Sequence, residues 1–271
     1  MNYQVYDPSP DLLPFVKCFW SLDDDGTEER IRQRVLPDGC MEMIFHYGDL
    51  YRQYFNDGSF IIQPRSFVFG QITQYIEIEP TGISGIISAR FHPEGLSPFL
   101  NIPVSSLEDK AIGIGSLFGE KGITLEKQIL AADNNLQRIE MMEHFLLSML
   151  ADPGTIDNIT KSCVDAIFQS QGQIPVADLA SKMSLNRRII ERKFATAVGM
   201  SPKQLSRAVR LQAAVKMLEE NKCASLTALA YENGYYDQAH FIKDFKEFTG
   251  TSPKSFFAGN LRFAALFASA E

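Results

Sequence analysis

The stretch that decides the fold is GYYDQAHFIKDFKEFTGTSPKSFF, residues 234–257. A glycine turn leads to Asp237, a residue type that caps a helix by accepting hydrogen bonds from the backbone N–H groups of its first turn. Phe241, Phe245 and Phe248 follow at helical spacing, so they share one face of the predicted helix. The opposite, polar face carries Gln238, His240 and Lys243.

A second copy of this pattern lies upstream in VADLASKMSLNRRIIERKFATAVGMSP, residues 176–202. Leu179-Ala180 aligns with Leu229-Ala230, 50 positions later. One additional residue in the second turn raises the offset to 51, which then pairs Asn186 with Asp237, Ile190 with Phe241, Phe194 with Phe245, Gly199 with Gly250, and Ser201-Pro202 with Ser252-Pro253. This ordered series predicts two copies of one structural unit.

Each copy predicts a short helix, a turn and a second helix. Asn186 or Asp237 caps the second helix, and a glycine ends it. The following Ser-Pro starts the next helix, with proline at its first position. Small alanines beside the turn allow the two helices to cross closely, as in a helix-turn-helix.

The exposed faces of the two second helices indicate nucleic-acid binding. Arginine and glutamine read guanine and adenine edges in the major groove, and lysine and arginine neutralise phosphates. A cation-rich face on one helix is usually only a solvated face, but two copies with the same cap and the same ending favour DNA contact. The predicted contacts are Arg187, Arg188, Glu191, Arg192 and Lys193 in the first copy, Gln238, Ala239, His240 and Lys243 in the second, and Lys203, Ser252 and Lys254 to phosphates.

A continuous helix is predicted between the copies, over residues 201–221, from Leu205, Val209, Ala213 and Met217 on one face. A rigid helix of this length would hold the two units at a fixed separation. Adjacent major grooves on one side of B-DNA lie about 34 Å apart. The doubled motif therefore fits two consecutive grooves.

The C-terminal third, about residues 160–258, resembles the DNA-binding domain of the AraC/XylS family of bacterial transcription regulators. The Gly-aromatic turn, the capped helix with two buried aromatics and the closing Gly-x-Ser-Pro of residues 234–253 carry this resemblance. It implies seven helices with two helix-turn-helix units bound to double-stranded DNA. Ser184 departs from the pattern, because the family commonly has glycine in the first turn, and so does the apolar tail LRFAALFASA at residues 261–270.

Charge divides the chain into two parts. The net formal charge is −7, but residues 1–160 carry −12 and residues 161–271 carry +5. An acidic part joined to a basic one is typical of a protein that meets a polyanion through one part only. The expected domains are residues 1–151 for sensing, 152–160 as a linker, 161–258 for DNA binding and 259–271 as a tail.

The acidic part is predicted to be mainly antiparallel β, barrel- or cupin-like, which makes the whole chain a two-domain α+β protein with an all-α C-terminal domain. Short β-rich runs are separated by turn residues, and a few segments look helical. The strands are expected in residues 15–22, 32–37, 40–47, 60–64, 66–72, 75–80 and 82–93, and the helices in residues 96–100, 105–117, 125–132 and 136–150. The apolar stripe of the last helix indicates packing within the domain rather than a dimer contact.

The acidic part offers weak candidates for a ligand site. The turns LPDG, residues 36–39, and FHPEG, residues 91–95, are either tight turns or the rim of a pocket. The candidate ligand contacts are Trp20, His46, Arg90 and His92. Four scattered cysteines, Cys18, Cys40, Cys163 and Cys223, predict reduced thiols without a zinc site. No metal, cofactor or catalytic residue is predicted.

The leading hypothesis is a cytoplasmic, non-enzymatic, DNA-binding transcription regulator that is modulated through its N-terminal domain. A small-molecule effector, a second copy of the chain and RNA polymerase are its candidate partners, and a membrane is not. One alternative is a DNA-modifying or repair enzyme, which would need a cysteine cluster or an activated cysteine. Another is a regulator that responds only to dimerisation or to a protein partner. An enclosed apolar pocket with converging polar groups in the N-terminal domain would argue against this alternative.

Overall fold

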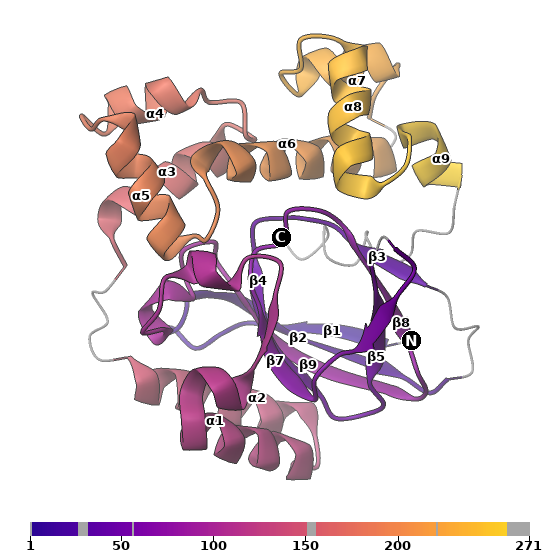
Figure 1. The fold of residues 1–271 in the computed structure, drawn as a ribbon, viewed down its shortest axis with the longest axis vertical. Coiled ribbons are helices and arrows are strands. Elements are labelled where there is room, and N and C mark those ends of the chain that lie inside the picture. Colours follow the sequence, from indigo (N-terminus) through magenta and orange to yellow (C-terminus); the bar gives the residue numbers. More distant parts are fainter. Residues whose placement is uncertain (1, 27–31, 56, 151–155, 221, 259–271) are drawn as a thin grey trace.

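The computed structural model describes residues 2–26, 32–55, 57–150, 156–220 and 222–258. Strands dominate the N-terminal part, and the C-terminal part is helical in the described residues (Figure 1). This division confirms the predicted fold class. None of the helices in the described part of the chain combines the length and apolar character that crossing a bilayer requires.

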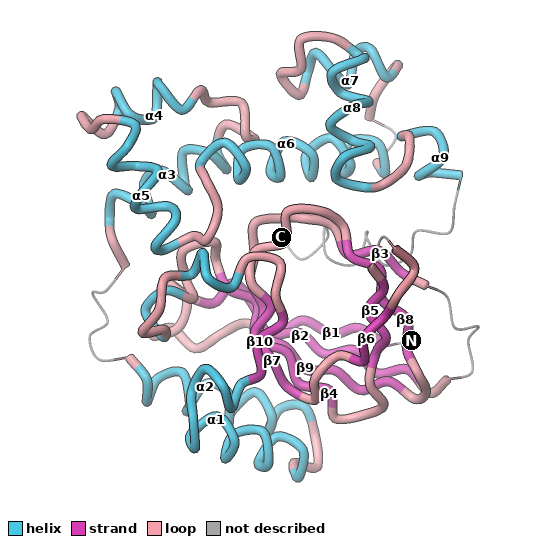
Figure 2. The backbone as a smooth tube through the Cα atoms, viewed as in Figure 1, coloured by secondary structure: helices cyan, strands magenta, loops and turns pink. Residues whose placement is uncertain are grey.

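Two antiparallel sheets build the N-terminal part (Figure 2). The larger sheet has the order β1-β2-β9-β4-β7-β10 and the smaller one the order β3-β8-β5-β6. The larger sheet contains β1 (Asn2–Tyr6), β2 (Val16–Asp24), β4 (Met41–His46), β7 (Ser66–Phe69), β9 (Ser84–Phe91) and β10 (Ala111–Gly113). The smaller sheet contains β3 (Gln33–Val35), β5 (Tyr51–Tyr54), β6 (Phe60–Ile62) and β8 (Ile76–Pro80).

Strand β9 is the centre of the larger sheet, and all eight of its residues are buried. One face of this sheet packs on α1 (Ile114–Ala131) and α2 (Asn135–Met149), and the other faces the smaller sheet. A strand covered on both faces has no solvated side, so its sequence, SGIISARF, is nearly continuously apolar. Ser84, Ser88 and Arg90 are the exceptions, and Arg90 lies on the face turned toward the smaller sheet.

Helix α2 confirms the predicted packing within the domain. Ile139, Met142 and Leu146 on its apolar stripe are buried in the same core as Phe45 and Ala89 of the larger sheet. Burial of such side chains contributes about 1.5–3 kcal/mol each. The domain's own core therefore covers the stripe, except at its first residue, Leu136, which is 68% exposed.

The seven predicted strands are confirmed, but the elements around them needed correction. The short strands β1, β5 and β10 were missed. The helix expected over residues 105–117 is wrong, because a 3₁₀ turn, Val104–Leu107, is followed by β10, and α1 starts only at Ile114. The helix expected over residues 96–100 is a single 3₁₀ turn, Ser97–Phe99.

Seven helices are described in the C-terminal part, as the resemblance implied. They are α3 (Asn158–Gln169), α4 (Val176–Lys182), α5 (Arg187–Ala197), α6 (Pro202–Glu219), α7 (Leu226–Glu232), α8 (Gln238–Thr249) and α9 (Pro253–Ala258). Helix α3 begins inside the segment predicted as a linker, and residues 151–155 of that region, like the apolar tail, lie outside the described residues.

Helix α6 joins two separate apolar cores. Its first half packs with α3, α4 and α5 around Ile190 and Phe194. Its second half packs with α7, α8 and α9 around Phe241 and Phe245. The two helix-turn-helix units therefore share one helix but have different cores, as the internal repeat predicts.

The predicted helix caps are present in both copies. The Asn186 side chain accepts a hydrogen bond from the backbone N–H of Ile189 at 3.0 Å, and Asp237 accepts one from His240 at 2.7 Å. Ser201 forms a reciprocal capping box with Gln204 at the start of α6. Caps of this kind fix where each second helix begins, and hence which residues face outward.

The turns of the two units differ at one position, where the first unit has a serine and the second a glycine. Ser184 adopts a positive φ of 53°, and Gly234 adopts 70° at the matching position of the second unit. A left-handed conformation is strained for a residue with a Cβ and free of strain for glycine.

We therefore expect Ser184→Gly to raise the free energy of unfolding by about 0.5–1 kcal/mol, measured by chemical denaturation. The reverse change, Gly234→Ala, should destabilise, since its Cβ would also lie 2.9 Å from the Gln173 side chain. A destabilised Ser184→Gly variant would contradict this explanation.

Candidate functional site

The exposed face of α5 carries the predicted base contacts of the first unit. Burial of Ile190 and Phe194 fixes the rotation of this helix, so that Arg188 and Arg192 are exposed to solvent. The exposed Arg187 guanidinium pairs with Glu191 across one helical turn, with a distance of 2.8 Å between Nε and Oε1. Because such an exposed pair is weak, it leaves Arg187 available to a phosphate or a base.

Lys193 lies at the edge of this face. Its Nζ is 2.9 Å from Asp157 Oδ1, and Asp157 also caps α3 by accepting from the backbone N–H of Thr160. Lys193 thus connects α5 to the start of α3, and of the five predicted residues it is the one held toward the domain itself.

Helix α8 presents the second face. Ala239, His240 and Lys243 are exposed, while Gln238 is half-buried and its Oε1 accepts a 2.7 Å hydrogen bond from Thr227 of α7. The His240 ring stands edge-on to Tyr235, with ring centroids 5.2 Å apart. This face is smaller and less basic than that of α5.

An ion-paired contact fixes α8 against the shared helix. Arg207 of α6 lies 3.0 Å from Asp244 and 2.8 Å from Glu247, both on α8. The Asp244 side chain is only 8% exposed, which strengthens its attraction to Arg207 relative to a fully solvated pair. These two carboxylates raise the pKa of Arg207, which stays charged at any physiological pH.

The length of α6 sets the separation of the two units. At 1.5 Å per residue its 18 residues span about 27 Å, and α5 and α8 lie at its opposite ends (Figure 1). That length is close to the distance of about 34 Å between successive major-groove segments.

The predicted phosphate contacts occupy equivalent places in the two units. Lys203 and Lys254 are exposed in the first turns of α6 and α9, two residues after the capping Ser201 and Ser252. The Ser252 hydroxyl accepts from the backbone N–H of Ser255 at 3.2 Å. The start of a helix favours an anion, so a lysine there is well placed beside a phosphate.

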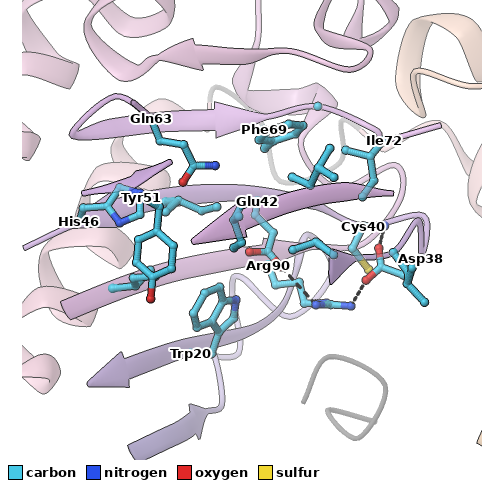
Figure 3. A pocket seen from close by; sticks show the side chains of 17 residues that line it. Trp20, Asp38, Cys40, Glu42, His46, Tyr51, Gln63, Phe69, Ile72 and Arg90 are labelled. Atoms are coloured by element: carbon cyan, nitrogen blue, oxygen red, sulfur yellow. Dashed lines mark hydrogen bonds and ion pairs between the residues drawn. The ribbon is translucent and has the colours of Figure 1, made fainter. Parts of the chain in front are cut away.

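A cavity of about 80 Å³ lies between the two sheets of the N-terminal part (Figure 3). Its walls are mainly apolar, with a few buried polar groups among them. The lining residues include Trp20 on β2, Glu42, Ile44 and His46 on β4, Tyr51 on β5, Ile78 on β8, Ile86 and Arg90 on β9, and Leu36, Asp38 and Cys40 in the loop between β3 and β4.

Three ionisable groups meet at one end of this cavity. The Arg90 side chain is only 3% exposed, and its guanidinium pairs with Asp38 and, at 3.1 Å, with Glu42. Burial raises the pKa of Glu42 to about 7, and the nearby Arg90 partly opposes this shift. A carboxyl that titrates near neutrality inside a cavity is typical of a functional site.

His46 lies at the other end, with 1% of its surface exposed. Its ring stacks on Tyr51 at 5.4 Å, and neither ring nitrogen has a protein hydrogen bond of acceptable geometry. Burial lowers the pKa of His46 to about 4, although the adjacent Gln63 side chain opposes this shift. The imidazole is therefore neutral at physiological pH, with one donor and one acceptor nitrogen.

The structure places three of the four candidate ligand residues in this cavity, namely Trp20, His46 and Arg90. His92 does not line it, and its electrostatic neighbours Lys161 and Asp165 belong to α3. Sequence reasoning missed Asp38 and Glu42. The signal for Glu42 was the alternation in β4, which puts Glu42, Ile44 and His46 on one face.

The loop Leu36–Cys40 is shared by the cavity and the helical C-terminal part. Leu36 lines the cavity and also packs in the apolar core around α6 and α8. The carbonyl oxygen of Pro37 accepts a 2.8 Å hydrogen bond from Gln212 of α6. Gly39, with φ of 83°, approaches α6 so closely that a Cβ there would lie 2.5 Å from Leu205 Cδ1.

The other segment predicted as a possible pocket rim, residues 91–95, does not line the cavity. In residues 91–95 the backbone N–H of Gly95 donates to the His92 carbonyl at 2.8 Å, which closes a tight turn away from the cavity. The loop Leu36–Cys40 is thus part of the cavity wall, whereas residues 91–95 form a tight turn outside this cavity, and Glu94 lines a separate pocket beside α5.

Three of the four cysteines, Cys18, Cys40 and Cys163, have thiols that are unreactive at neutral pH. Cys18 and Cys163 are buried, and burial raises the pKa of each thiol above its ordinary value. Burial and the neighbouring Asp38 raise the pKa of Cys40 to about 11. These thiols stay protonated at neutral pH and are poor nucleophiles, unlike the activated cysteine that an alkyl-transfer enzyme requires.

Comparison with protein families gives two matches. Residues 179–259 match a helix-turn-helix domain family, and residues 4–113 match a domain of unknown function (DUF6597). The first match confirms the resemblance predicted from the internal repeat. The second covers the strands that enclose the cavity and assigns them no activity.

Two curated relatives are regulatory proteins. An uncharacterized HTH-type transcriptional regulator of Haemophilus influenzae is 30% identical over 135 residues, which cover 48% of this chain and 45% of the relative. The Msm operon regulatory protein of Streptococcus mutans is 27% identical over 160 residues, which cover 58% of this chain and 51% of the relative. The matches thus span about half the length of each relative.

Solved structures give more distant similarities. ToxT from Vibrio cholerae matches with a TM-score of 0.45 and 11% identity, covering 89% of this chain and 97% of ToxT. The C-terminal domain of AraT from Geobacillus stearothermophilus matches with a TM-score of 0.37 and 20% identity, covering 40% of this chain and 90% of that domain.

Proposed function

We propose that this chain, which carries an AraC-type helix-turn-helix domain at residues 179–259, is a sequence-specific transcription regulator that binds promoter DNA. The observation that carries the proposal is the pair of capped helices, α5 and α8, at the two ends of α6 with their polar faces exposed. Each second helix would enter the major groove, as the recognition helix of a helix-turn-helix does.

The two units would contribute differently to binding. Arg188 and Arg192 on α5 have the exposure and the forked donor geometry that reading guanine requires. Ala239, His240 and Lys243 on α8 would add fewer base contacts, while Lys203 and Lys254 would hold phosphates. Because several cations meet phosphates, binding should weaken steeply as salt increases.

The N-terminal cavity supports modulation by a small molecule. It is enclosed by two sheets, apolar and furnished with a few polar groups, which are the features of a ligand site. The loop Leu36–Cys40 connects its wall to α6 through the hydrogen bond between Gln212 and Pro37. We further propose that the protein forms a homodimer, contacts RNA polymerase and functions in the cytoplasm.

The alternatives have less support. A repair or DNA-modifying enzyme would need a reactive thiol, and burial keeps those of Cys18, Cys40 and Cys163 protonated. A regulator without a small-molecule effector would be expected to have a tightly packed barrel interior, whereas this interior holds a cavity beside a buried histidine.

The experiment that tests the proposal is in vitro selection of bound DNA, followed by gel-shift titration of variants. We expect Arg188→Ala to weaken binding to the selected site by about tenfold or more and to relax the preference at one base pair. Lys161→Ala is the matched control, since it also removes one exposed cation, but from α3. Equal affinity and specificity for the wild type and Arg188→Ala would contradict the assignment of α5.

A further inference from the structure

On the face of the larger sheet that borders the cavity, the side chains of β2, β9 and β4 form three rows that run across the strands. Cys18 pairs with Arg90 and Arg90 with Glu42, which forms a row of ionisable side chains across β2, β9 and β4. The next row on this face contains Trp20, Ser88 and Ile44, and the third contains Leu22, Ile86 and His46. Four residues of strand separate Glu42 from His46, or about 13 Å.

Arg90 and the two carboxyl groups that pair with it, those of Asp38 and Glu42, form one charged group at this end of the cavity. With both carboxyls ionised this group has a net charge of −1. An anionic ligand would have to displace a carboxylate from Arg90 or lie beside two of them, which costs free energy in a poorly solvated site.

The remaining walls favour a ligand with an apolar body. Aromatic and aliphatic side chains surround the space next to the charged row, and a cation near an aromatic face gains further attraction. Figure 3 shows Trp20 and Phe69 on opposite sides of the row formed by Glu42 and Arg90. The volume of about 80 Å³ limits the ligand to a few non-hydrogen atoms.

His46 indicates that the cavity is built for an occupant. It is a buried polar side chain that points into the cavity, and neither ring nitrogen makes a hydrogen bond of acceptable geometry within the described residues, although the Gln63 side chain lies beside it. Leaving such a group unsatisfied costs about 1–3 kcal/mol, so it is rarely kept without a role.

We propose that the cavity binds a small organic amine, with its ammonium group at the carboxylates of Glu42 and Asp38 and its apolar body against Trp20, Phe69 and the isoleucines. Without a ligand, burial keeps the pKa of Glu42 at about 7, so the carboxyl is partly protonated at neutral pH, and a bound ammonium group would lower that pKa. The inference rests on the proposed function only in making this amine the effector of a regulator; the binding itself does not depend on DNA.

Three molecules with one skeleton test the charge preference. Isobutylamine, isobutanol and isobutyrate differ mainly in the polar group, and n-propylamine, n-propanol and propionate repeat the comparison on a smaller body. Trp20 is the only tryptophan of the chain and lines the cavity, so its fluorescence reports occupancy directly. We expect the amine of at least one skeleton to bind about tenfold more tightly than its alcohol, and the carboxylate not to bind.

Variants of the full chain locate the binding. Glu42→Gln should weaken amine binding by about tenfold and change alcohol binding less than twofold. Glu140→Gln, an exposed carboxylate on α2, is the control and should change neither. His46→Phe, at the other end of the cavity, should change amine binding less than Glu42→Gln does, and it should raise the midpoint of thermal unfolding because it removes an unsatisfied imidazole from an aromatic cluster.

Several outcomes would overturn the inference. These are a carboxylate that binds more tightly than its amine, an alcohol that binds as tightly as its amine, the absence of a fluorescence change with all six compounds, and undiminished amine binding to Glu42→Gln. Gel shifts of the same preparations on selected DNA, without added amine, report the DNA-binding function separately. Failure of the amine inference would therefore leave the regulator proposal standing, and the reverse also holds.

Discussion

Replacement of Phe245 by alanine is expected to lower the free energy of unfolding of the second helix-turn-helix unit by about 3–5 kcal/mol. Phe245 is fully buried, and its ring packs edge-on against Phe241 at 5.6 Å and Phe256 at 5.1 Å. Truncation would leave a cavity between α6, α8 and α9. Loss of this magnitude should unfold α8 locally and abolish specific DNA binding.

Hydrogen exchange and chemical denaturation would measure this effect. Because the two units have separate cores, exchange should accelerate most in α7, α8 and α9 and least in α4 and α5. Phe194→Ala should give the opposite distribution. Tyr236→Ala removes an aromatic ring that is 85% exposed in the same unit, and it should leave stability within about 0.5 kcal/mol of the wild type. A uniform acceleration throughout residues 158–258 would show that the two cores unfold together.

Arg90→Met is expected to lower the free energy of unfolding by about 3–5 kcal/mol at pH 8, because it leaves Asp38 and Glu42 beside the cavity without their positive partner. The loss should shrink toward pH 5. The pKa of Glu42 in the folded wild type is about 7, above the ordinary value of 4.5, so the folded state binds the proton more tightly than the unfolded chain does. Stability from this group therefore falls as pH rises between about 4.5 and 7, and removal of Arg90 steepens the fall.

Denaturation at several pH values would test this dependence. His46 acts in the opposite direction, since its folded pKa of about 4 lies below the usual 6.5 and stability is lost as pH falls through that interval. Glu42→Gln isolates the two contributions, because only the carboxyl is removed. The double variant with Arg90→Met and Glu42→Gln should recover part of the stability lost in Arg90→Met, and equal stability of Arg90→Met at pH 5 and pH 8 would contradict the role of Glu42.

The fold of the helical C-terminal part could be predicted from the sequence because its information is local and repeated. Asn186 and Asp237 each cap a helix a few residues away, and Ile190 and Phe241 fix the rotation of that same helix. Because the same pattern recurs 50 or 51 residues later, each cap or core residue assigned in one copy can be checked against its equivalent in the other. Whether these exposed faces read bases stays a prediction until binding is measured.

The cavity could not be predicted in the same way. Its charged row joins β2, β9 and β4, which are neighbours in the sheet but not in the chain, and Tyr51 reaches it from the other sheet. A strand such as Tyr51–Tyr54, which reads YRQY, has no apolar run to mark it and was missed. The sequence indicated Trp20, His46 and Arg90 one by one, and only the register shows that Arg90 and Glu42 are cross-strand partners.

The loop Leu36–Cys40 has a thermodynamic consequence for the whole molecule. Its Asp38 pairs with Arg90 in the cavity, while its Pro37 carbonyl binds Gln212 on the helix that spaces the two DNA-binding units. A ligand in the cavity that stabilises one conformation of this loop would also stabilise the position of α6 that goes with it. The coupling free energy between the two sites is reciprocal. Whatever factor the occupant applies to operator affinity, operator DNA must apply to the affinity for the occupant. A titration of Trp20 fluorescence with and without DNA would thus measure the coupling between the two sites from the cavity alone.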